Sequence, residues 1–194
     1  MDNIYLISQA ISAFSSNQVT DVGSGADSAI SFWSPQVPFG WGMLGMTATP
    51  NYNAPPSVTQ NVYRCSGAGG VSTPSALLKV WTCSGHHQSS NLGIYMPMAP
   101  NGFIALGCVA VMDFKEPPSL GDFPALICVR QDLCEQVTLS NDTDLVWTDK
   151  DSKAPNNVSV WMLPTARTCV ATVQRDGYPS KVSVWDIKKA SMSL

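Results

Sequence analysis

Apolar and polar residues alternate in six short segments of this chain, and each segment ends on a tryptophan or a tyrosine. The six segments are 29–33, 77–81, 92–95, 144–147, 158–161 and 181–185. A period of two is typical of strands in a sheet that has one buried face. No segment shows a convincing helical period, and residues 4–14 are the one ambiguous case. The pattern therefore predicts an all-β fold.

One long apolar run and two proline-rich segments refine this prediction. The run 103–111 is almost entirely apolar, so we expect a strand that is buried on both faces or bent at Gly107. The Pro-x-x-Pro segments 35–38 and 97–100 should not lie in a central strand, because proline lacks the N–H that a sheet ladder needs. They are expected at sheet edges or crossovers, next to turns at Gly40 and Gly102.

The chain repeats itself at a nearly fixed distance. Segment 33–45 recurs as 95–107, at an offset of 62 residues, with the shared pattern aromatic-x-Pro-x-x-Pro-x-Gly-x-x-x-Leu-Gly. A third, weaker copy is recognised because 146–148 repeats 80–82 at an offset of 66, although its Gly-x-x-x-Leu-Gly stretch has been lost. Such repetition indicates one supersecondary unit that is used several times.

The repeat predicts the domain organisation and the architecture. We divide a single domain, residues 1–194, into units of about 4–61, 62–125 and 126–187. Three units that each bury one face predict a pseudo-threefold β-prism-like domain, with three sheets of three or four strands around one apolar axis. A β-trefoil is the alternative, although its units are usually shorter, about 40–50 residues.

Composition and charge exclude several classes of protein. Charged residues make up 13% of the 194 residues, while glycine and proline number 14 each, which favours short strands and turns over helices. The net charge of −3 and the scattered basic residues give no reason to expect nucleic acid as a partner. The longest apolar stretch, 102–112, is too short for the roughly 20 residues that a transmembrane helix needs.

The start of the chain and the six cysteines bear on its location. The first residues lack the basic and apolar regions of a secretory signal, so we expect a cytoplasmic protein, with peripheral membrane binding or non-classical export as alternatives. In that setting the cysteines are expected to be free buried thiols rather than disulfides.

The best candidate for ligand binding is the loop 21–27. Asp21 and Asp27 flank a glycine-rich stretch that contains Gly23, and such a loop can hydrogen-bond sugar hydroxyls or coordinate Ca²⁺ through oxygen ligands. The alternative interpretation is a hairpin turn whose glycines adopt positive φ. Unit three offers Asp149 and Asp151 in the corresponding loop, whereas unit two offers a cysteine and two histidines.

One aromatic residue joins the candidate ligand-binding set. The repeated strand-end aromatics, Trp33, Tyr95 and Trp161, are expected in the core. Phe39, Trp41 and Phe103, around the proline-glycine turns, are the candidates for exposure, and Trp41 is the best of them. The predicted ligand-binding residues are therefore Asp21, Gly23, Asp27, Trp41, Asp149 and Asp151.

The sequence gives little support for catalysis or a resident metal. His86 and His87 are adjacent, so on a strand they would point to opposite faces, and no second Cys/His cluster completes a zinc site. No nucleophile motif accompanies these histidines. We expect no catalytic residues, no metal ligands and no cofactor apart from the weak Ca²⁺ alternative, and hence not an enzyme.

The ordered motifs resemble the vacuolar-protein-sorting sixty-two family. The resemblance rests on Asp-x-Gly-Ser-Gly-Ala from Asp21, on Ser-Phe-Trp-Ser-Pro-x-x-Pro-x-Gly-x-x-x-Leu-Gly up to Gly45, and on Cys-Val-Arg-Gln-Asp-Leu from Cys128. It covers roughly residues 19–165. The units also resemble adaptor-binding repeats of lipid-transfer proteins and the β-prism tail of membrane attack complex/perforin toxins. In this chain Val19 replaces the family's first tryptophan and Cys83 replaces the acidic residue of the middle copy.

This resemblance implies two functional hypotheses. The first is a non-enzymatic, lectin-like recognition module that binds glycans or lipid head groups at membranes, with a role in defence or as a pesticidal protein. The second is a peptide-binding adaptor scaffold in membrane trafficking, which would take up a peptide or protein partner by strand addition at a free sheet edge.

Overall fold

The protein is all-β. The computed structural model describes residues 4–52, 55–57, 59–84 and 89–193, and in this part of the chain the regular elements are strands and short 3₁₀ helices, with no α-helix. Residues 4–14, which were ambiguous in the sequence, contain a strand. The three 3₁₀ helices are η1 (Leu120–Asp122), η2 (Gln131–Leu133) and η3 (Lys189–Ser191).

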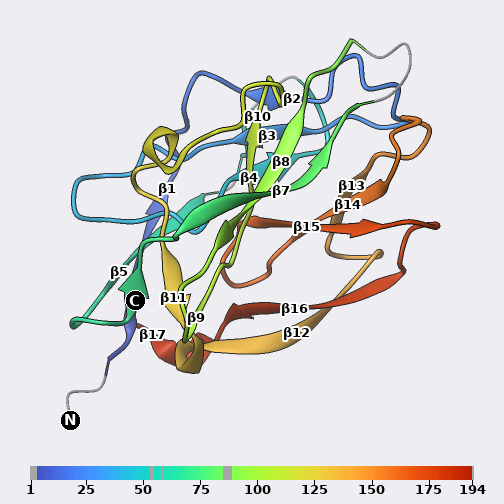
Figure 1. Ribbon diagram of the computed structural model, residues 1–194. Helices are drawn as coiled ribbons and strands as arrows, with labels where there is room; N and C mark the ends of the chain where they lie inside the picture. Colours follow the sequence, from blue (N-terminus) through green and yellow to red (C-terminus); the bar gives the residue numbers. More distant parts are fainter. Residues whose placement is uncertain (1–3, 53–54, 58, 85–88, 194) are drawn as a thin grey trace.

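Each unit contributes one antiparallel three-stranded sheet with its second strand in the centre (Figure 1). We call these three sheets the first tier. The sheet of unit one consists of β2 (Val19–Thr20), β3 (Ser31–Trp33) and β4 (Thr47–Thr49). The sheet of unit two consists of β7 (Ala76–Thr82), β8 (Gly93–Met98) and β10 (Val109–Val111). The sheet of unit three consists of β13 (Leu145–Thr148), β14 (Asn157–Met162) and β15 (Cys169–Gln174).

Three further sheets, which the sequence did not predict, form a second tier. Strand β1 (Leu6–Ile11) lies between β5 (Gln60–Cys65), which is antiparallel to it, and β17 (Met192–Ser193), which is parallel. Strand β11 (Cys128–Arg130) lies between β6 (Val71–Ser72) and β9 (Phe103–Ile104). Strands β12 (Cys134–Ser140) and β16 (Lys181–Ile187) form a two-stranded ribbon, which lies below β15 in Figure 1.

A ring of three backbone hydrogen bonds joins the units around an approximate threefold axis. The N–H of Met46 donates to the carbonyl of Cys108 at 2.8 Å, that of Cys108 to Cys169 at 2.7 Å, and that of Cys169 to Met46 at 2.9 Å. The backbones approach closely here: a Cβ on Gly45 would lie 2.8 Å from the Gly107 Cα. The two copies of Leu-Gly therefore exist because this crossing leaves no room for side chains.

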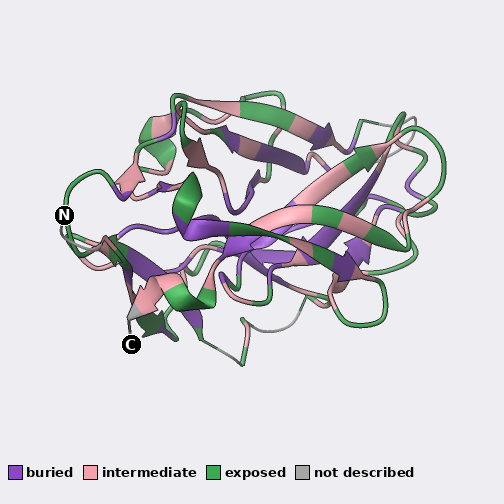
Figure 2. Cartoon of the chain, turned by 90° about the horizontal axis from the view of Figure 1, so that it is seen from below, coloured by how far each residue is buried: buried purple, intermediate pink, exposed green. Residues whose placement is uncertain are grey.

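Two apolar clusters fill the interior, and Figure 2 shows the buried residues, in purple, concentrated on strands in the middle of the molecule. In the first tier, the rings of Trp81 and Trp147 meet edge to face with centroids 5.9 Å apart. Each indole N–H crosses to the next unit, Trp81 to the carbonyl of Asn156 at 2.8 Å and Trp147 to that of Ser28 at 2.9 Å. Val19 stands where unit one would supply a third indole, so one of the three crossings is missing.

Several expectations can be compared with these strands. Trp33, Tyr95 and Trp161 are buried, as expected of strand-end aromatics. The run 103–111 is interrupted around Gly107, between β9 and β10. The exclusion of proline from central strands was wrong for Pro97, which lies in the central strand β8 and pairs with Leu77. Strand β10 reaches only as far as Tyr95, so β8 has a single neighbour at Pro97 and the missing N–H costs no ladder bond.

The six cysteines are present as thiols in this fold. None of the six cysteines forms a disulfide, and five of them are buried, with Cys65 half-buried. Burial raises the pKa of the Cys83 thiol to about 11 and also raises the pKa of the other four buried thiols, which favours their protonated form at neutral pH. In the described part of the chain, no helix is long and apolar enough to cross a membrane.

Candidate functional site

Asp21, at the start of the predicted binding loop, is almost completely buried. Its Oδ1 accepts hydrogen bonds from the Ile30 N–H at 2.9 Å and the Tyr52 hydroxyl at 2.8 Å, and its Oδ2 accepts one from the Ser24 hydroxyl at 2.8 Å. Only 1% of the residue is exposed. The carboxylate is therefore committed to holding its own loop, and the structure places it away from any ligand that approaches from solvent.

Asp149 of unit three makes the same set of contacts. Its Oδ1 accepts from the Val158 N–H at 2.8 Å and from the Tyr178 hydroxyl at 3.1 Å, and its Oδ2 accepts from the Ser152 hydroxyl at 2.8 Å. Burial and the neighbouring Asp149 carboxylate raise the pKa of Tyr178 above its ordinary value, which keeps its hydroxyl as a donor. We call this arrangement of aspartate, serine and tyrosine the loop frame.

Unit two lacks the loop frame. Cys83 occupies the position of the aspartate, because its N–H donates to the Leu92 carbonyl at 2.9 Å just as that of Asp21 donates to Ile30 and that of Asp149 to Val158. Phe114, 62 residues after Tyr52, replaces the tyrosine. The carboxylate and the hydroxyl are thus absent together, as expected if a buried carboxylate is tolerated only with its donors. His86 and His87, the candidate metal ligands of this loop, lie outside the described residues.

Gly23 joins the loop of unit one to that of unit two. Its backbone has φ of 84°, a conformation that favours glycine, and its carbonyl accepts hydrogen bonds from the N–H groups of Ser89 and Ser90 at 3.2 and 3.3 Å. A Cβ at this position would overlap the Ser89 hydroxyl. Gly23 is therefore required by the turn itself.

Asp27 and Asp151 are the predicted site residues that face solvent in these loops. Asp27 pairs with Lys150 at 3.1 Å, and its N–H donates to the Lys150 carbonyl at 2.9 Å. Asp151, with φ of 68°, is the neighbour of Lys150 and is also exposed. The hydrogen bond and the charge of Asp27, together with the charge of Asp151, raise the pKa of Lys150. We call this meeting point of the loops of units one and three, at the upper right of Figure 1, the loop junction.

Trp41 lies in a separate cleft. It lines a cleft of about 390 Å³ together with Arg64, whose guanidinium lies 4.8 Å from the centre of the indole ring. Trp41 is half-buried, whereas the neighbouring Phe39 is fully exposed. The structure therefore divides the six predicted residues: three support the loops, two form part of the loop junction, and Trp41 belongs to a different surface.

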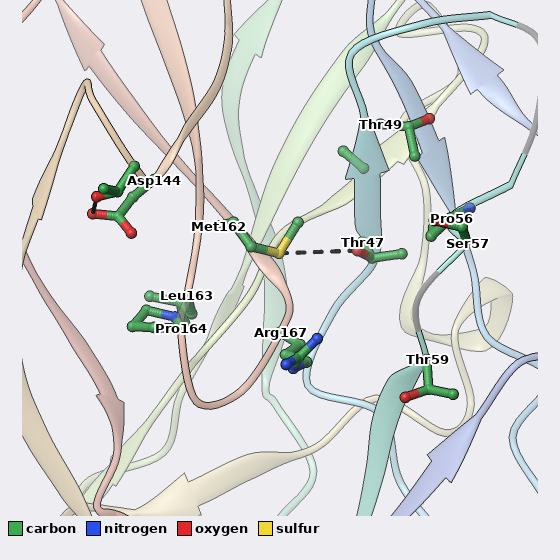
Figure 3. A pocket seen from close by; sticks show the side chains of 12 residues that line it. Thr47, Thr49, Pro56, Ser57, Thr59, Asp144, Met162, Leu163, Pro164 and Arg167 are labelled. Carbon is green, nitrogen blue, oxygen red and sulfur yellow. Dashed lines mark hydrogen bonds between the residues drawn. The ribbon is translucent and has the colours of Figure 1, made fainter.

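A cleft that sequence reasoning missed separates unit three from unit one. Its volume is about 400 Å³ (Figure 3). Unit one contributes the hydroxyls of Thr47, Thr49 and Thr59. Unit three contributes Met162, residues of the turn that follows it, and Thr143 and Asp144. The Thr49 hydroxyl also accepts a hydrogen bond from the Trp33 indole at 3.0 Å, which fixes that side of the cleft. The signal for this cleft in the sequence was the decayed third copy of the repeat.

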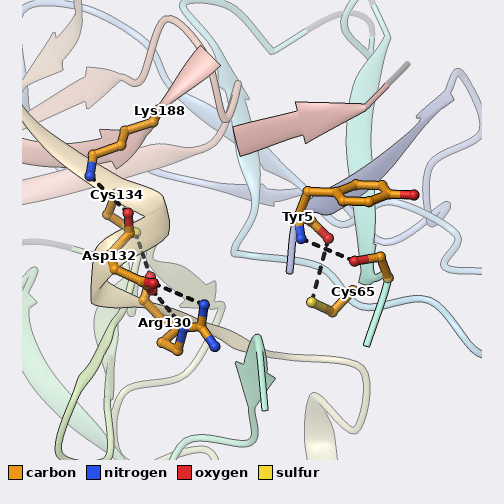
Figure 4. Close-up of polar contacts among 7 residues, drawn as sticks. Tyr5, Cys65, Arg130, Asp132, Cys134 and Lys188 are labelled. Carbon is orange, nitrogen blue, oxygen red and sulfur yellow. Dashed lines mark hydrogen bonds and ion pairs between the residues drawn. The ribbon is translucent and has the colours of Figure 1, made fainter. Parts of the chain in front are cut away.

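The Cys-Val-Arg-Gln-Asp-Leu motif forms a self-contained ion pair in the second tier. The Arg130 guanidinium donates to both carboxylate oxygens of Asp132, at 2.6 and 2.8 Å (Figure 4). Lys188 donates from Nζ to the Asp132 carbonyl at 2.8 Å, which ties the C-terminal segment to η2. The hydrogen bonds from Arg130 and its charge hold the pKa of Asp132 below its usual range. This motif is explained by the fold without a ligand.

The described residues contain no group of three or more His, Cys, Asp or Glu side chains that could hold a metal ion. Both oxygens of Asp21 and of Asp149 accept hydrogen bonds from the loop frame, so they are poorly placed to coordinate the Ca²⁺ considered for these loops.

Comparison with known proteins agrees with this architecture. The profile of the family Vacuolar protein sorting-associated protein 62 (Vps62) matches residues 5–182. The crystal structure of GNIP1Aa from Chromobacterium piscinae superposes with a TM-score of 0.82 at 22% sequence identity, and it covers 100% of this chain. The chain spans 39% of the length of GNIP1Aa, and at this identity the likeness shows the fold alone. No curated protein matches the chain significantly. Because the family profile covers nearly the whole chain, this protein belongs to the Vps62 family.

Proposed function

We propose that the protein is a non-enzymatic, lectin-like recognition module that binds glycans or lipid head groups at membrane surfaces. The observation that carries the proposal is the loop junction, where Asp27, Lys150 and Asp151 face solvent at one place. Carboxylates accept hydrogen bonds from sugar hydroxyls, and an ammonium donates to them, so a small patch with both groups can satisfy a polyhydroxylated ligand.

The buried loop frames support this proposal because they hold the loops in place before any ligand arrives. The Asp21 frame spans loop 21–30 and the Asp149 frame spans loop 149–158, and each uses three hydrogen bonds to one carboxylate. Binding by loops that are already ordered costs less conformational entropy than binding by loops that must become ordered. Loops at one end of a rigid β scaffold are also a common place for recognition sites.

The length of this chain relative to that of GNIP1Aa fits the interpretation as a module. Because the chain spans 39% of GNIP1Aa, the same fold occurs there as one part of a longer chain. A role in defence or as a pesticidal protein belongs to the same proposal and rests on the resemblance of the repeats to toxin tail domains.

The proposal is tested with a glycan array and with vesicles of neutral and anionic phospholipids. The wild-type chain should bind at least one class of ligand, and the double variant Asp27→Ala/Asp151→Ala should lose most of that binding with little change in melting temperature. The control is Asp142→Ala/Asp176→Ala, which removes two exposed carboxylates elsewhere. Wild-type protein that binds no glycan and no vesicle would contradict the proposal.

A peptide-binding adaptor is the second candidate, and one observation favours it. In the described residues, β12 and β16 pair only with each other, so the ribbon has two outer edges whose backbone groups are available for strand addition. Pull-down with short proline-containing peptides, lost when proline is introduced along an outer edge of the ribbon, would favour this function over the first.

A further inference from the structure

The cleft between units three and one, of about 400 Å³, is divided at the equivalent place between units one and two. There, a groove of about 180 Å³ is lined by Pro35, Val37 and Met43 of unit one and by residues 122–125 of unit two. A separate hollow of about 440 Å³ is lined by Val111 and by residues of the segment 113–122. The approximate threefold symmetry is therefore broken here, because the cleft between units three and one is undivided.

A shortened turn explains the difference. Met46 follows Trp33 by 13 positions and Cys108 follows Tyr95 by 13, whereas Cys169 follows Trp161 by only eight. Strands β14 and β15 are consequently joined by a tight turn in which the Leu163 N–H donates to the Thr168 carbonyl at 2.9 Å. The longer turn of unit one supplies Val37 and Met43 to the smaller groove, and unit three has no equivalent of that segment. The shorter turn leaves the cleft open.

Arg167 is presented to this cleft by the shortened turn. Its N–H donates to the Leu163 carbonyl at 2.9 Å, and its φ of 56° is unfavourable for any residue with a side chain. The residue is exposed, and its guanidinium forms no ion pair or hydrogen bond within the described part of the chain. A strained backbone that holds an unpaired cation in a cleft is typical of a functional position.

Asp144 provides a negative charge in the same cleft. Its Oδ2 accepts hydrogen bonds from the Ser140 N–H at 2.9 Å and the Thr143 hydroxyl at 2.8 Å, which fix the carboxylate, while its Oδ1 accepts none from the described residues. Asp144 and Arg167 line one cleft without pairing, and Figure 3 shows them on different sides of Met162. A carboxylate and a guanidinium that line one cleft without pairing suit a ligand that carries both an ammonium group and a phosphate.

We propose that this cleft binds a phosphate ester that carries an ammonium group, as phosphocholine and phosphoethanolamine do. The planar Arg167 guanidinium donates to the phosphate oxygens, the Thr59 hydroxyl adds a neutral donor, and the Asp144 carboxylate takes the ammonium. Met162 and Pro164 give apolar contact to the carbon chain between the two charges. The volume is suited to a ligand of this size.

This inference deepens the proposed function, on which it rests for the biological source of the ligand, but it concerns a site distinct from the loop junction. The shared chemistry occurs both in soluble phosphocholine and in the head group of phosphatidylcholine. Titration with the soluble ester and sedimentation with vesicles distinguish the two sources.

The test is isothermal titration of phosphocholine into the full chain. The wild type should bind saturably, and Arg167→Gln and Asp144→Asn should each weaken binding by about tenfold or more, the effect of one lost charge-assisted contact. Arg175→Gln and Asp176→Asn are matched controls, because these exposed residues follow β15 outside the cleft. Arg167→Gly, which suits the positive φ, is a second variant that removes the cation while the fold is preserved.

Binding of further ligands and of vesicles separates the free ester from the lipid head group as the source. Inorganic phosphate and choline should each bind at least about tenfold more weakly than phosphocholine, because each lacks one of the two charges. Phosphatidylcholine vesicles that sediment with the wild type, and release it when phosphocholine is added, would identify the lipid as the source; binding of soluble phosphocholine alone would identify the free ester. No saturable binding of phosphocholine by folded wild type, or equal binding by Arg167→Gly, would overturn the inference. Glycan binding that persists in that case would leave the loop-junction proposal standing.

Discussion

Replacing Asp21 with alanine should destabilise the protein far more than replacing Asp27, although both carboxylates lie in one loop. Asp21 is buried and accepts three hydrogen bonds, whereas Asp27 faces solvent and pairs with a single exposed lysine. The two substitutions remove the same chemical group, so any difference between them reports the environment of the carboxylate.

The magnitude follows from the donors that Asp21→Ala leaves behind. The Ile30 N–H and the Ser24 hydroxyl belong to buried residues, and each buried donor without a partner costs about 1–3 kcal/mol. Tyr52 is 38% exposed, so water can replace the acceptor of its hydroxyl. Because the variant also no longer buries a charge, we expect a net loss of about 2–4 kcal/mol, which lowers the melting temperature of a domain of this size by roughly 5–15 °C.

Calorimetry and urea unfolding of the wild type, Asp21→Ala and Asp27→Ala measure this difference. Asp149→Ala provides an independent repetition, because its loop frame in unit three has the same contacts. An Asp21→Ala variant that unfolds within about 0.5 kcal/mol of the wild type, the range of an ordinary surface substitution, would show that the loop frame does not stabilise the fold. A larger loss in Asp27→Ala than in Asp21→Ala would show the same.

Three further predictions address the axis, the middle unit and the second tier. Gly45→Ala should be strongly destabilising in urea unfolding, by about 3 kcal/mol or more, because its Cβ would meet the backbone of a neighbouring unit. Gly40→Ala should cost only about 1 kcal/mol, because φ of 80° is strained but no atom of the described residues lies within 4 Å of the added Cβ; equal losses would disprove the close crossing. Tyr95→Phe should be neutral or stabilising by about 1 kcal/mol, since the buried Tyr95 hydroxyl has no hydrogen-bond partner among residues 4–52, 55–57, 59–84 and 89–193, and a large loss would show that it has one. Burial, opposed by three backbone N–H donors, raises the pKa of Asp186 from 3.8, so its contribution to stability is present below that pH and is lost as the pH rises through the folded-state pKa. Relative to Asp186→Asn, the wild type should therefore lose stability on going upward from pH 3.8, and a pH-independent difference would contradict the assignment.

The central strands of the first tier, and the strands β7 and β13, were predictable because the segments that form them alternate apolar and polar residues and end on an aromatic residue. Segment 158–161, for example, lies within β14, and segment 92–95 overlaps β8, which begins at Gly93. Apart from β16, which contains segment 181–185, most of the second tier was not predictable, because strands such as β6 and β17 have two residues each and carry no recognisable period. Their positions depend on contacts with sequence-distant segments, such as the pairing of β1 with β17 near the chain end.

The candidate loops were identified from the sequence, but the roles of their aspartates were not. Asp21 and Asp27 both appear as carboxylates in a polar, glycine-rich turn, and no local pattern separates a buried acceptor from an exposed one. The serine three residues after Asp21, and again after Asp149, is the signal that a loop frame leaves in the sequence. Arg167 was missed because it lies where the repeat has decayed, and only the structure shows that the shortened turn opens a cleft.

A crystal structure with a bound ligand would test recognition at the loop junction most directly. The chain should be soaked with the tightest-binding glycan or head group found on the array or among the vesicle lipids. We expect ligand density against Asp27, Lys150 and Asp151, where the loops of units one and three meet. Ligand density confined to the cleft of Trp41 and Arg64, with the loop junction empty, would contradict it.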